Sequence, residues 1–363
     1  MADTLPVFIC TMKPSDFDYH LPPEQIATRP AEPRDASRLM VVPRGGGSFS
    51  HHHFSDLPSL LRPGDCLVIN DSRVLPARLR VNRPTGGAVE LLLVKPVGEG
   101  RWEAMVRPGR KVRPGMRLTL PGGAGTARVI EGESEYTHII EFELEGDLFE
   151  FLEREGETPL PPYILRRRET QGEPRHDTPA DRELYQTVYA DESGSIAAPT
   201  AGLHFTTKLL AELNDRGIDV QRITLHVGLG TFEPVTSERI EDHVMHHETY
   251  GIDDPAAAAI DEARRNPHRR VVAVGTTSVR ALESCFAIHG RLDAETRETN
   301  LFIHPGFQFN VIDALLTNFH LPSSSLLMLV AAFAGRESIL SAYREAIERG
   351  YRFYSYGDAM FID

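Results

Sequence analysis

The chain has 363 residues, of which 41% are hydrophobic and 25% charged, a composition typical of globular proteins. Its formal net charge of −13 at pH 7 argues against a protein that coats nucleic acid nonspecifically, because phosphates repel an acidic surface. A chain of this length is long for one hydrophobic core, so we expect two domains.

Targeting and redox features are those of a cytoplasmic protein. The longest apolar run, residues 326–333, is well short of the roughly 20 residues that cross a bilayer, so we expect no membrane span. The N-terminus lacks the basic, apolar and small-residue regions of a secretion signal. Cys10, Cys66 and Cys285 are far apart and odd in number, so they predict neither a disulfide framework nor a zinc site. We therefore expect a reduced, cytoplasmic protein without a metal.

Short strand patterns fill the chain from residue 65 to about residue 144. Residues 66–69 and 89–94 are compact apolar runs, and apolar and polar residues alternate over residues 102–106 and 136–142. Turns rich in glycine and proline separate these runs. Several short strands with this punctuation predict a small barrel or sandwich.

Helices alternate with strands in the rest of the chain. Residues 208–216 predict a helix that ends at Gly217, and residues 218–227 predict the strand that follows it. Residues 270–274 predict a further strand, and residues 277–286 place their apolar side chains on one helical face. This alternation predicts an α/β layer architecture.

The simplest organisation is an α/β domain interrupted by an inserted all-β domain, a small antiparallel barrel. The α/β catalytic domain then comprises residues 1–64 and 155–363, and the barrel comprises residues 65–154. The polar segment 166–181 is rich in arginine, glutamate and proline, and it predicts a mobile loop or linker.

Six stretches combine glycine, histidine, hydroxyl and aromatic residues in a way that suits a ligand site. They are residues 194–205, 225–233, 243–248, 274–280, 317–322 and 353–360. Small residues let the backbone approach a ligand, and helix N-termini attract anions. Each stretch also has a purely structural interpretation, such as a packing loop, a helix cap or a terminal strand. Spacing alone leaves both interpretations open.

The histidine-rich stretch is the one whose spacing raises the question of a metal. His243 is separated from His246 and His247 so that two imidazoles would share one face of a helix. No second cluster of histidine and cysteine has the spacing of metal ligands. Acid–base chemistry by a histidine and a glutamate is therefore the better functional interpretation.

Taken together and in chain order, these stretches resemble one family, the S-adenosylmethionine:tRNA ribosyltransferase-isomerases of queuosine biosynthesis. Further matching motifs are DFDYHLP at 16–22, EPRDASRL at 32–39, NDSRV at 70–74, PLPPYI at 159–164, YQTVYA at 185–190 and TNLFI at 299–303. The resemblance covers nearly the whole chain.

The resemblance implies a reaction on tRNA that carries 7-aminomethyl-7-deazaguanine at the wobble position of the anticodon. It implies S-adenosylmethionine as the co-substrate, used as a ribosyl donor rather than as a methyl donor. The implied products are epoxyqueuosine in tRNA, adenine and methionine. The family also implies an α/β domain with a β-barrel domain, and no metal.

The matched motifs and the polar character of their side chains suggest roles for individual residues. The candidates for proton transfer are His226, His243, His246, Glu248, Asp71 and Asp358. The candidates for the S-adenosylmethionine pocket are Gly275, Thr276, Thr277, Arg280, Asn318 and His320. The candidates for tRNA binding are Arg73, Arg78, Arg110, Lys111, Arg113, Arg166 and Arg167.

Two other classes of protein compete with this interpretation. A conventional S-adenosylmethionine-dependent methyltransferase should have a glycine-rich loop after its first strand and an acidic residue at the end of the next strand, and the sequence lacks that arrangement. A non-catalytic tRNA-binding protein is disfavoured by the net charge of −13 and by the histidine- and glycine-rich loops. No interface signature is visible, so we expect a monomer.

Overall fold

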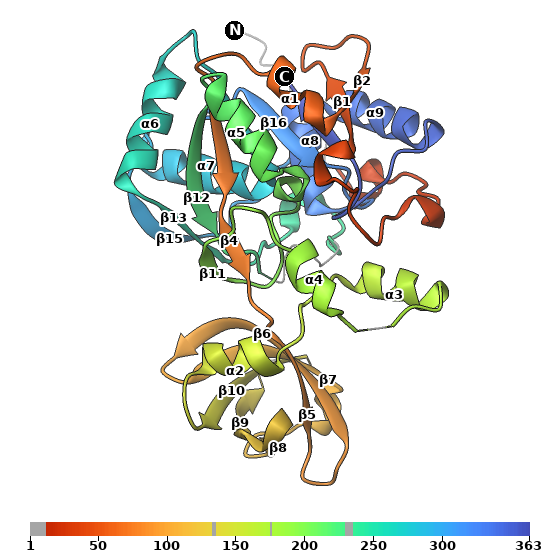
Figure 1. Cartoon of the computed structure of the whole chain (residues 1–363), viewed down its shortest axis with the longest axis vertical. Coiled ribbons are helices and arrows are strands. Elements are labelled where there is room, and N and C mark those ends of the chain that lie inside the picture. Colours follow the sequence, from red (N-terminus) through yellow and green to blue (C-terminus); the bar gives the residue numbers. More distant parts are fainter. Residues whose placement is uncertain (1–11, 133–135, 175, 229–234) are drawn as a thin grey trace, which may run out of the picture.

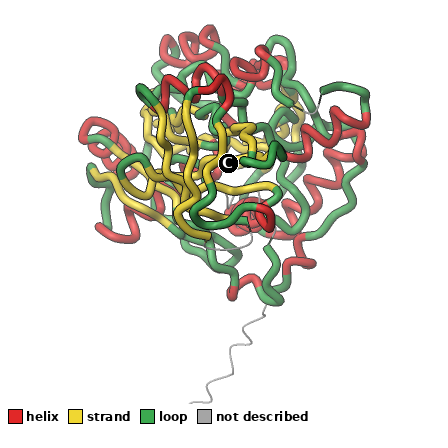
Figure 2. Tube along the Cα trace, turned by 90° about the horizontal axis from the view of Figure 1, so that it is seen from below, coloured by secondary structure: helices red, strands yellow, loops and turns green. Residues whose placement is uncertain are grey.

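Two bodies of β structure make up the protein, a nine-stranded mixed sheet and a closed six-stranded barrel (Figure 1). The computed structural model describes residues 12–132, 136–174, 176–228 and 235–363. In Figure 1 the barrel lies below the larger sheet and its helices, and in the end-on view of Figure 2 most helices lie around the strands. The predicted barrel and α/β parts are therefore both present.

The larger sheet has a parallel centre, one antiparallel flank and one mixed flank. Its central strands are, in spatial order, β12 (Asp219–Leu225), β3 (Cys66–Asn70), β14 (Val271–Val274) and β16 (Ala314–Asn318). On one side follow β13 (Glu248–Ile252) and β15 (Glu295–Thr299), and on the other β17 (Ala359–Ile362), β1 (Arg38–Val42) and β2 (Ser50–His53). In this second, mixed flank, β17 and β1 pair in parallel. The parallel centre fixes one edge at which several strands end together.

Alternate residues of the central strands face two separate helical layers. Cys66 and Val68 pack into the core on the face that carries α6 to α9. Leu67 and Ile69 pack into the core on the opposite face. The first layer comprises α6 (Asp254–Arg265), α7 (Gly275–His289), α8 (Ser325–Ala334) and α9 (Arg336–Glu348), and the second comprises α1 (Leu57–Leu60) and α5 (Thr207–Asp215). Burial on both faces explains why β3 and β14 are nearly continuous apolar runs.

Side-chain caps and a glycine set the boundaries of α5 and α6. The Thr206 hydroxyl accepts the backbone N–H of Leu209 at 3.1 Å and begins α5. Gly217, with φ of +78°, follows the end of that helix as predicted. The Asp253 carboxylate accepts the N–H of Ala256 at 2.8 Å and begins α6.

The barrel closes on itself through antiparallel neighbours only. Its order is β10 (Thr137–Leu144), β7 (Arg101–Arg107), β6 (Ala88–Gly98), β5 (Arg78–Asn82), β8 (Arg117–Thr119) and β9 (Gly125–Gly132). Trp102, Ala104 and Val106 point into its core, as their alternation predicts. The helix α2 (Leu148–Glu155) adds Phe151 and Leu152 to the same core.

The strand Cys66–Asn70 is not part of the barrel, contrary to a boundary at residue 65. It pairs in parallel with β12 and β14 at the centre of the larger sheet. The short strand β4 (Ser72–Val74) pairs with β11 (Glu192–Ser195) in a separate two-stranded sheet. The barrel strands begin only at Arg78. The predicted boundary was misplaced because a short apolar run in the sequence does not reveal which strand it pairs with.

The segment predicted as a mobile loop contains ordered helices. Its described residues belong largely to α3 (Pro162–Thr170) and α4 (Pro179–Leu184). Arg168 and Asp181 form a buried two-point ion pair between them, with N–O distances of 2.8 and 2.6 Å. Asp181 also accepts the N–H of Thr178 at 2.7 Å, so one carboxylate both neutralises the arginine and begins α4.

Among the described residues, no single helix is long and apolar enough to cross a membrane. The sharply bent pair α8 and α9 reaches that length and composition only when the two helices are taken together.

Candidate active site

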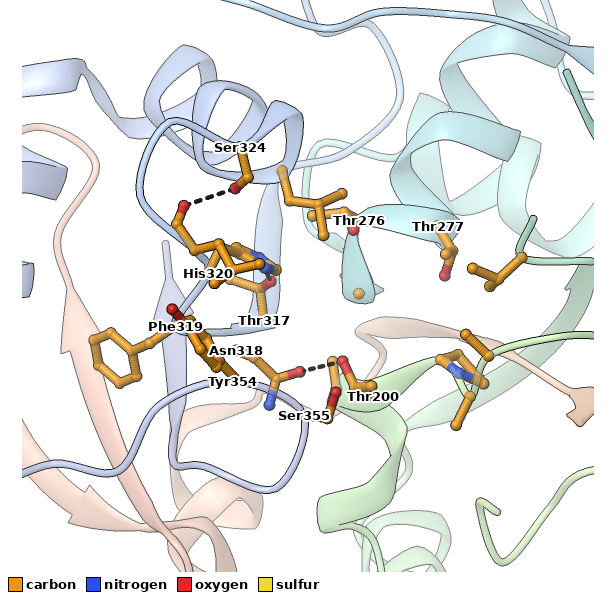
Figure 3. Close-up of a pocket in the computed structure, with 18 of the residues that line it drawn as sticks. Thr200, Thr276, Thr277, Thr317, Asn318, Phe319, His320, Ser324, Tyr354 and Ser355 are labelled. Atoms are coloured by element: carbon orange, nitrogen blue, oxygen red, sulfur yellow. Dashed lines mark hydrogen bonds between the residues drawn. The ribbon is translucent and has the colours of Figure 1, made fainter. Parts of the chain in front are cut away.

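A pocket opens where β14 and β16 end and where a short helical turn, Thr200–His204, meets them (Figure 3). It encloses about 730 Å³, counting its opening to solvent. Its polar and aromatic lining comprises Thr200, Gly275, Thr276, Thr277, Thr317, Asn318, His320, Tyr163, Tyr185, Tyr354 and Ser355. The carboxyl ends of parallel strands are where open α/β sheets bind ligands.

The N-terminus of α7 faces this pocket without a side-chain cap. The helix begins at Gly275, directly after β14, and its N-cap residue Val274 makes no side-chain cap. Gly275 has φ of +85°, a conformation that favours glycine. Thr276 and Thr277 add hydroxyls beside the N–H groups of this first turn. The arrangement suits a carboxylate or another anion.

A buried chain of hydrogen bonds fixes one wall of the pocket. The Thr200 hydroxyl donates to Asn318 Oδ1 at 2.8 Å, and Asn318 Nδ2 donates to His204 Nε2 at 3.0 Å. Burial lowers the pKa of His204 to about 4, so its imidazole is neutral at pH 7. Its Nδ1 then carries the proton and donates to Ser37 Oγ at 2.8 Å. Because the Thr200 hydroxyl already donates its proton to Asn318, its oxygen can only accept a hydrogen bond from a ligand.

His320 is a second neutral histidine of the lining. Burial lowers its pKa to about 3, and Nε2 lies 2.8 Å from the Thr317 hydroxyl. Its backbone N–H donates to the hydroxyl of Tyr343 at 2.8 Å, and the Tyr19 hydroxyl donates to its carbonyl oxygen. These contacts hold the residue in place as a neutral hydrogen-bonding group rather than as a cation.

Aromatic rings form another side of the pocket. The rings of Tyr163 and Tyr354 meet edge-on with centroids 4.7 Å apart. The Tyr163 hydroxyl bonds to Ser355 Oγ, and burial raises the pKa of Tyr163 to about 12. This neutral aromatic side suits the face of a heterocyclic ring.

Five of the six residues predicted for the co-substrate lie together in this lining, and Arg280 does not. Arg280 forms a buried ion pair with Glu248, and its Nε donates to the carbonyl oxygen of Leu301 at 3.0 Å. Glu248 Oε1 also accepts the N–H of Gly228 at 2.8 Å. The pair joins α7 to β13, and the contact with Gly228 ties it to the segment after β12. Neither residue is part of the pocket lining.

The remaining candidates for proton transfer are not among the residues that line the pocket. His226 lies against Gly194, and its buried Nδ1 has no hydrogen-bond partner among the described residues. Burial lowers the pKa of His226 and raises that of Asp71, whose carboxylate accepts the Thr224 hydroxyl at 2.7 Å. Asp358 is engaged by Arg38 and Arg352.

The histidine-rich stretch is not helical, contrary to the shared helical face predicted for it. A short turn ends at Asp242, and the chain then runs without regular structure until β13 begins at Glu248. His243 packs its ring against Phe302, and His246 is exposed. The two imidazoles therefore do not share a helical face. Part of the neighbouring stretch, residues 229–233, lies outside the described residues.

The basic residues predicted for tRNA occupy different environments. Arg73, Arg110, Lys111, Arg113 and Arg166 are exposed, and Arg167 is partly buried. Arg78 is only 6% exposed and donates to the carbonyl oxygen of Leu160 at 3.1 Å. A side chain buried to this degree does not belong to an open phosphate-binding surface.

Several residues of the pocket were not predicted from sequence. Thr200, His204, Thr317, Tyr163 and Ser355 reach the site or support it through side-chain hydrogen bonds. The small-residue stretch 194–205 and the aromatic C-terminal stretch signalled the segments but not the individual side chains.

One group among the described residues has the proximity of metal ligands: Cys285, His289 and Glu295. It lies toward the far end of α7 from the pocket. The Glu295 carboxylate already accepts from Tyr250 and Arg297, and His289 contacts it at 3.1 Å.

A family model described as queuosine biosynthesis protein matches residues 14–362. The chain belongs to this family. A relative from Moorella thermoacetica, named S-adenosylmethionine:tRNA ribosyltransferase-isomerase, is 54% identical over 97% of this chain and 100% of its own length. A relative of the same name from Symbiobacterium thermophilum is 52% identical with the same coverage. The crystal structure of the S-adenosylmethionine tRNA ribosyltransferase from Thermotoga maritima is 37% identical, with a TM-score of 0.53 over 96% of this chain and 100% of that chain. The resemblance predicted from the motifs is thus confirmed.

Proposed function

We propose that this member of the queuosine biosynthesis family is an S-adenosylmethionine:tRNA ribosyltransferase-isomerase. It transfers and isomerises the ribosyl group of S-adenosylmethionine onto 7-aminomethyl-7-deazaguanine in tRNA, with adenine and methionine as the other products. The observation that carries the proposal is the pocket itself. In it meet the N-terminus of α7, two walls held by neutral histidines and a side made of aromatic rings.

The lining has chemistry for each part of S-adenosylmethionine. The methionine carboxylate suits the N–H groups at Gly275, Thr276 and Thr277. The ribose hydroxyls or the adenine amino group suit the Thr200 oxygen, which is left as an acceptor. Adenine suits the rings of Tyr163 and Tyr354.

The reaction needs proton transfer in a place from which water is excluded. The sulfonium acidifies the protons on the adjacent ribose carbon, so a neutral base can begin the reaction. The departing adenine needs a hydrogen-bond donor, and the aminomethyl nitrogen must be neutral to attack. Burial of His204 and His320 is consistent with a pocket that holds neutral groups.

His226 is the strongest of the candidates for the base. Its neighbour Val227 lines the pocket, its pKa is lowered by burial, and its Nδ1 is unpartnered among the described residues. Asp71, His243, His246 and Glu248 remain proposals for other proton transfers. Asp358 is the weakest, because two arginines already engage its carboxylate.

The domain division, the tRNA contacts, the oligomeric state and the location of the protein are also proposals. We assign the barrel as an inserted domain whose strands begin at Arg78, with the catalytic domain on both sides of it in sequence. The exposed basic residues Arg110, Lys111, Arg113 and Arg166 are proposed to contact tRNA phosphates. A monomeric protein acting in the cytoplasm stays a prediction from the sequence.

The test is a turnover assay with S-adenosylmethionine and tRNA bearing 7-aminomethyl-7-deazaguanine. We expect equal amounts of adenine and methionine and a matching mass gain on the tRNA nucleoside. Formation of S-adenosylhomocysteine instead would establish methyl transfer. If well-folded protein binds tRNA but makes no product, the alternative of a non-catalytic tRNA-binding protein would be supported instead.

A further inference from the structure

A second cavity lies between the barrel and the segment that leads into α3. Arg78, Glu90 and Met105 line it from β5, β6 and β7, which are neighbouring strands of the barrel. Residues 159–162 and Ile196 complete it from the other side. It encloses about 800 Å³ with its opening, within the range of small-ligand sites.

Most of its wall is apolar, but three charged residues line it: Arg78 and Glu90, which lie side by side, and the exposed Arg107. Arg78 is buried, and its Nε has no hydrogen-bond partner among the described residues. That atom lies 4.0 Å from the carboxylate of Glu90, beyond hydrogen-bond reach, and the Glu90 side chain is 37% exposed. A buried guanidinium N–H without an acceptor is costly, so a ligand oxygen that reaches it would be favoured.

Only a thin layer of chain separates this cavity from the proposed active site. Pro162 lines the second cavity, and the next residue, Tyr163, lines the first. Ile196 and Ala197 divide the two spaces in the same way. A polymer whose reacting base occupies the first pocket therefore passes close to the second.

The chemistry of the wall favours a base over a phosphate. Arg78 and Arg107 would attract a phosphate, but Arg107 is exposed to solvent, and beside the buried Arg78 a phosphate would meet the Glu90 carboxylate and apolar side chains, both of which disfavour it. A planar base can pack against Met105 and the prolines, accept at a carbonyl oxygen from Arg78 and donate an N–H to Glu90. Unstacked bases in single-stranded RNA loops are recognised through such edges and faces.

We propose that this cavity binds one unstacked base of tRNA beside the modified nucleotide, and that the base carries a carbonyl oxygen next to an N–H group. The inference rests on the proposed function, since it takes tRNA as the substrate. It adds a specificity site in which Arg78 reads the carbonyl group and Glu90 reads the donor.

The test measures equilibrium binding of RNA hairpins that carry 7-aminomethyl-7-deazaguanine, without S-adenosylmethionine. Each loop nucleotide in turn is replaced by an abasic one. We expect one abasic position to weaken binding to the wild-type protein about tenfold. Glu90→Gln should weaken binding of the intact hairpin. The abasic nucleotide at that position should then lower the affinity of the variant much less than it lowers the affinity of the wild-type protein. Glu131→Gln, on the exposed end of β9, is the matched control and should behave as wild type.

Additive effects of Glu90→Gln and of every abasic position would overturn the proposal. Arg78→Lys provides a second variant that keeps the charge but not the geometry, and it should show the same loss of response. Turnover is measured separately. If the wild-type protein showed this coupling but released no adenine, the result would contradict the proposed reaction and still support the base-binding site. Failure of well-folded protein to bind the hairpins would overturn both.

Discussion

At the scale of single residues, the pocket depends on polar groups that are held in one protonation state. Ser37, His204, Asn318 and Thr200 form a chain in which each hydrogen bond sets the direction of the next. This series of hydrogen bonds ends at the Thr200 oxygen, which can only accept a further hydrogen bond. Substrate hydroxyl or amino groups are favoured there, and groups without a proton to donate are not.

The first prediction concerns the Thr200 oxygen. Thr200→Val keeps the shape of the side chain but removes the acceptor, so we expect the KM for S-adenosylmethionine to rise about tenfold. Thr200→Ser keeps the hydroxyl and should stay close to wild type. Adenine release as a function of S-adenosylmethionine concentration measures both, with thermal unfolding as a check on folding. An unchanged KM in the valine variant would show that the oxygen does not contact the co-substrate.

The second prediction concerns the pH dependence of stability. Burial lowers the pKa of His204 to about 4 and that of His320 to about 3 in the folded protein. The unfolded chain binds these protons first as the pH falls below about 6.5, so the free energy of unfolding should decrease from there to pH 3–4. The loss is about 1.4 kcal/mol for each unit of pKa difference.

Denaturant unfolding at a series of pH values measures this dependence. His204→Gln and His320→Gln remove one titrating group each and keep hydrogen-bonding atoms. Each variant should lose less stability than wild type between pH 6.5 and 4. Parallel curves for wild type and both variants would contradict the assignment of these histidines as buried and neutral.

Sequence patterns identified Asn318 and His320 but not Thr200 and His204, for a physical reason. The Asn318 segment carries polar residues after an apolar strand, which is a local signal. Thr200 is joined to Asn318 by a hydrogen bond across 118 residues, and no local pattern records it. Arg280 was misplaced for the same reason, since its ionic partner Glu248 lies 32 residues away.

At the scale of elements, α7 is the helix on which the site depends. It follows β14 without a loop, and the positive φ of Gly275 makes that direct turn possible. The same helix ends at Gly290, which has φ of +69°. The two glycines are therefore conformationally similar but lie at opposite ends, and only the first lines the pocket.

The third prediction uses these two glycines as a matched pair. Alanine at either position is strained by the positive φ and should cost about 1–2 kcal/mol of stability. Gly275→Ala should also weaken S-adenosylmethionine binding, because it disturbs the first turn of α7. Gly290→Ala should leave binding unchanged, since nothing lies within 4 Å of the added carbon. Calorimetric titration and thermal unfolding test this; equal affinities would show that the helix N-terminus does not bind the ligand.

Elements with local signals were predicted well, and elements with long-range partners were not. The glycine that follows α5 is such a local signal, and the helix stop predicted at Gly217 is found. The strand β3 was assigned to the barrel because a five-residue apolar run has the same appearance in either body. α3 and α4 were missed because their polar composition resembles a linker, whereas the buried pair of Arg168 and Asp181 orders them.

At the scale of the whole molecule, an acidic protein must attract a polyanion. The net charge of −13 works against association with tRNA, so exposed basic residues have to act locally. Arg110, Lys111 and Arg113 form such a group on the barrel. The exposed Arg166 lies on α3, in the other body.

The fourth prediction follows from that distribution. Replacing Arg110, Lys111 and Arg113 together by glutamine should weaken tRNA binding at low salt. It should also reduce the slope of log affinity against log salt by up to about 2, if all three contact phosphates. Lys208→Gln with Arg216→Gln on α5, which are also exposed, serves as the control. Binding measured at several salt concentrations decides the matter; an unchanged slope would remove this group from the tRNA surface.

The edge strand β15 has a consequence for how copies of the protein behave toward one another. It ends the large sheet on one side, and its sequence, Glu-Thr-Arg-Glu-Thr, exposes Arg297 and Glu298 to solvent. A strand from a second copy that added there would have to bring further side chains up against these charges and disrupt the contact between Arg297 and Glu295. Charged edges of this kind oppose runaway sheet extension, so the molecule resists fibrillar aggregation at an edge that an apolar strand would leave open.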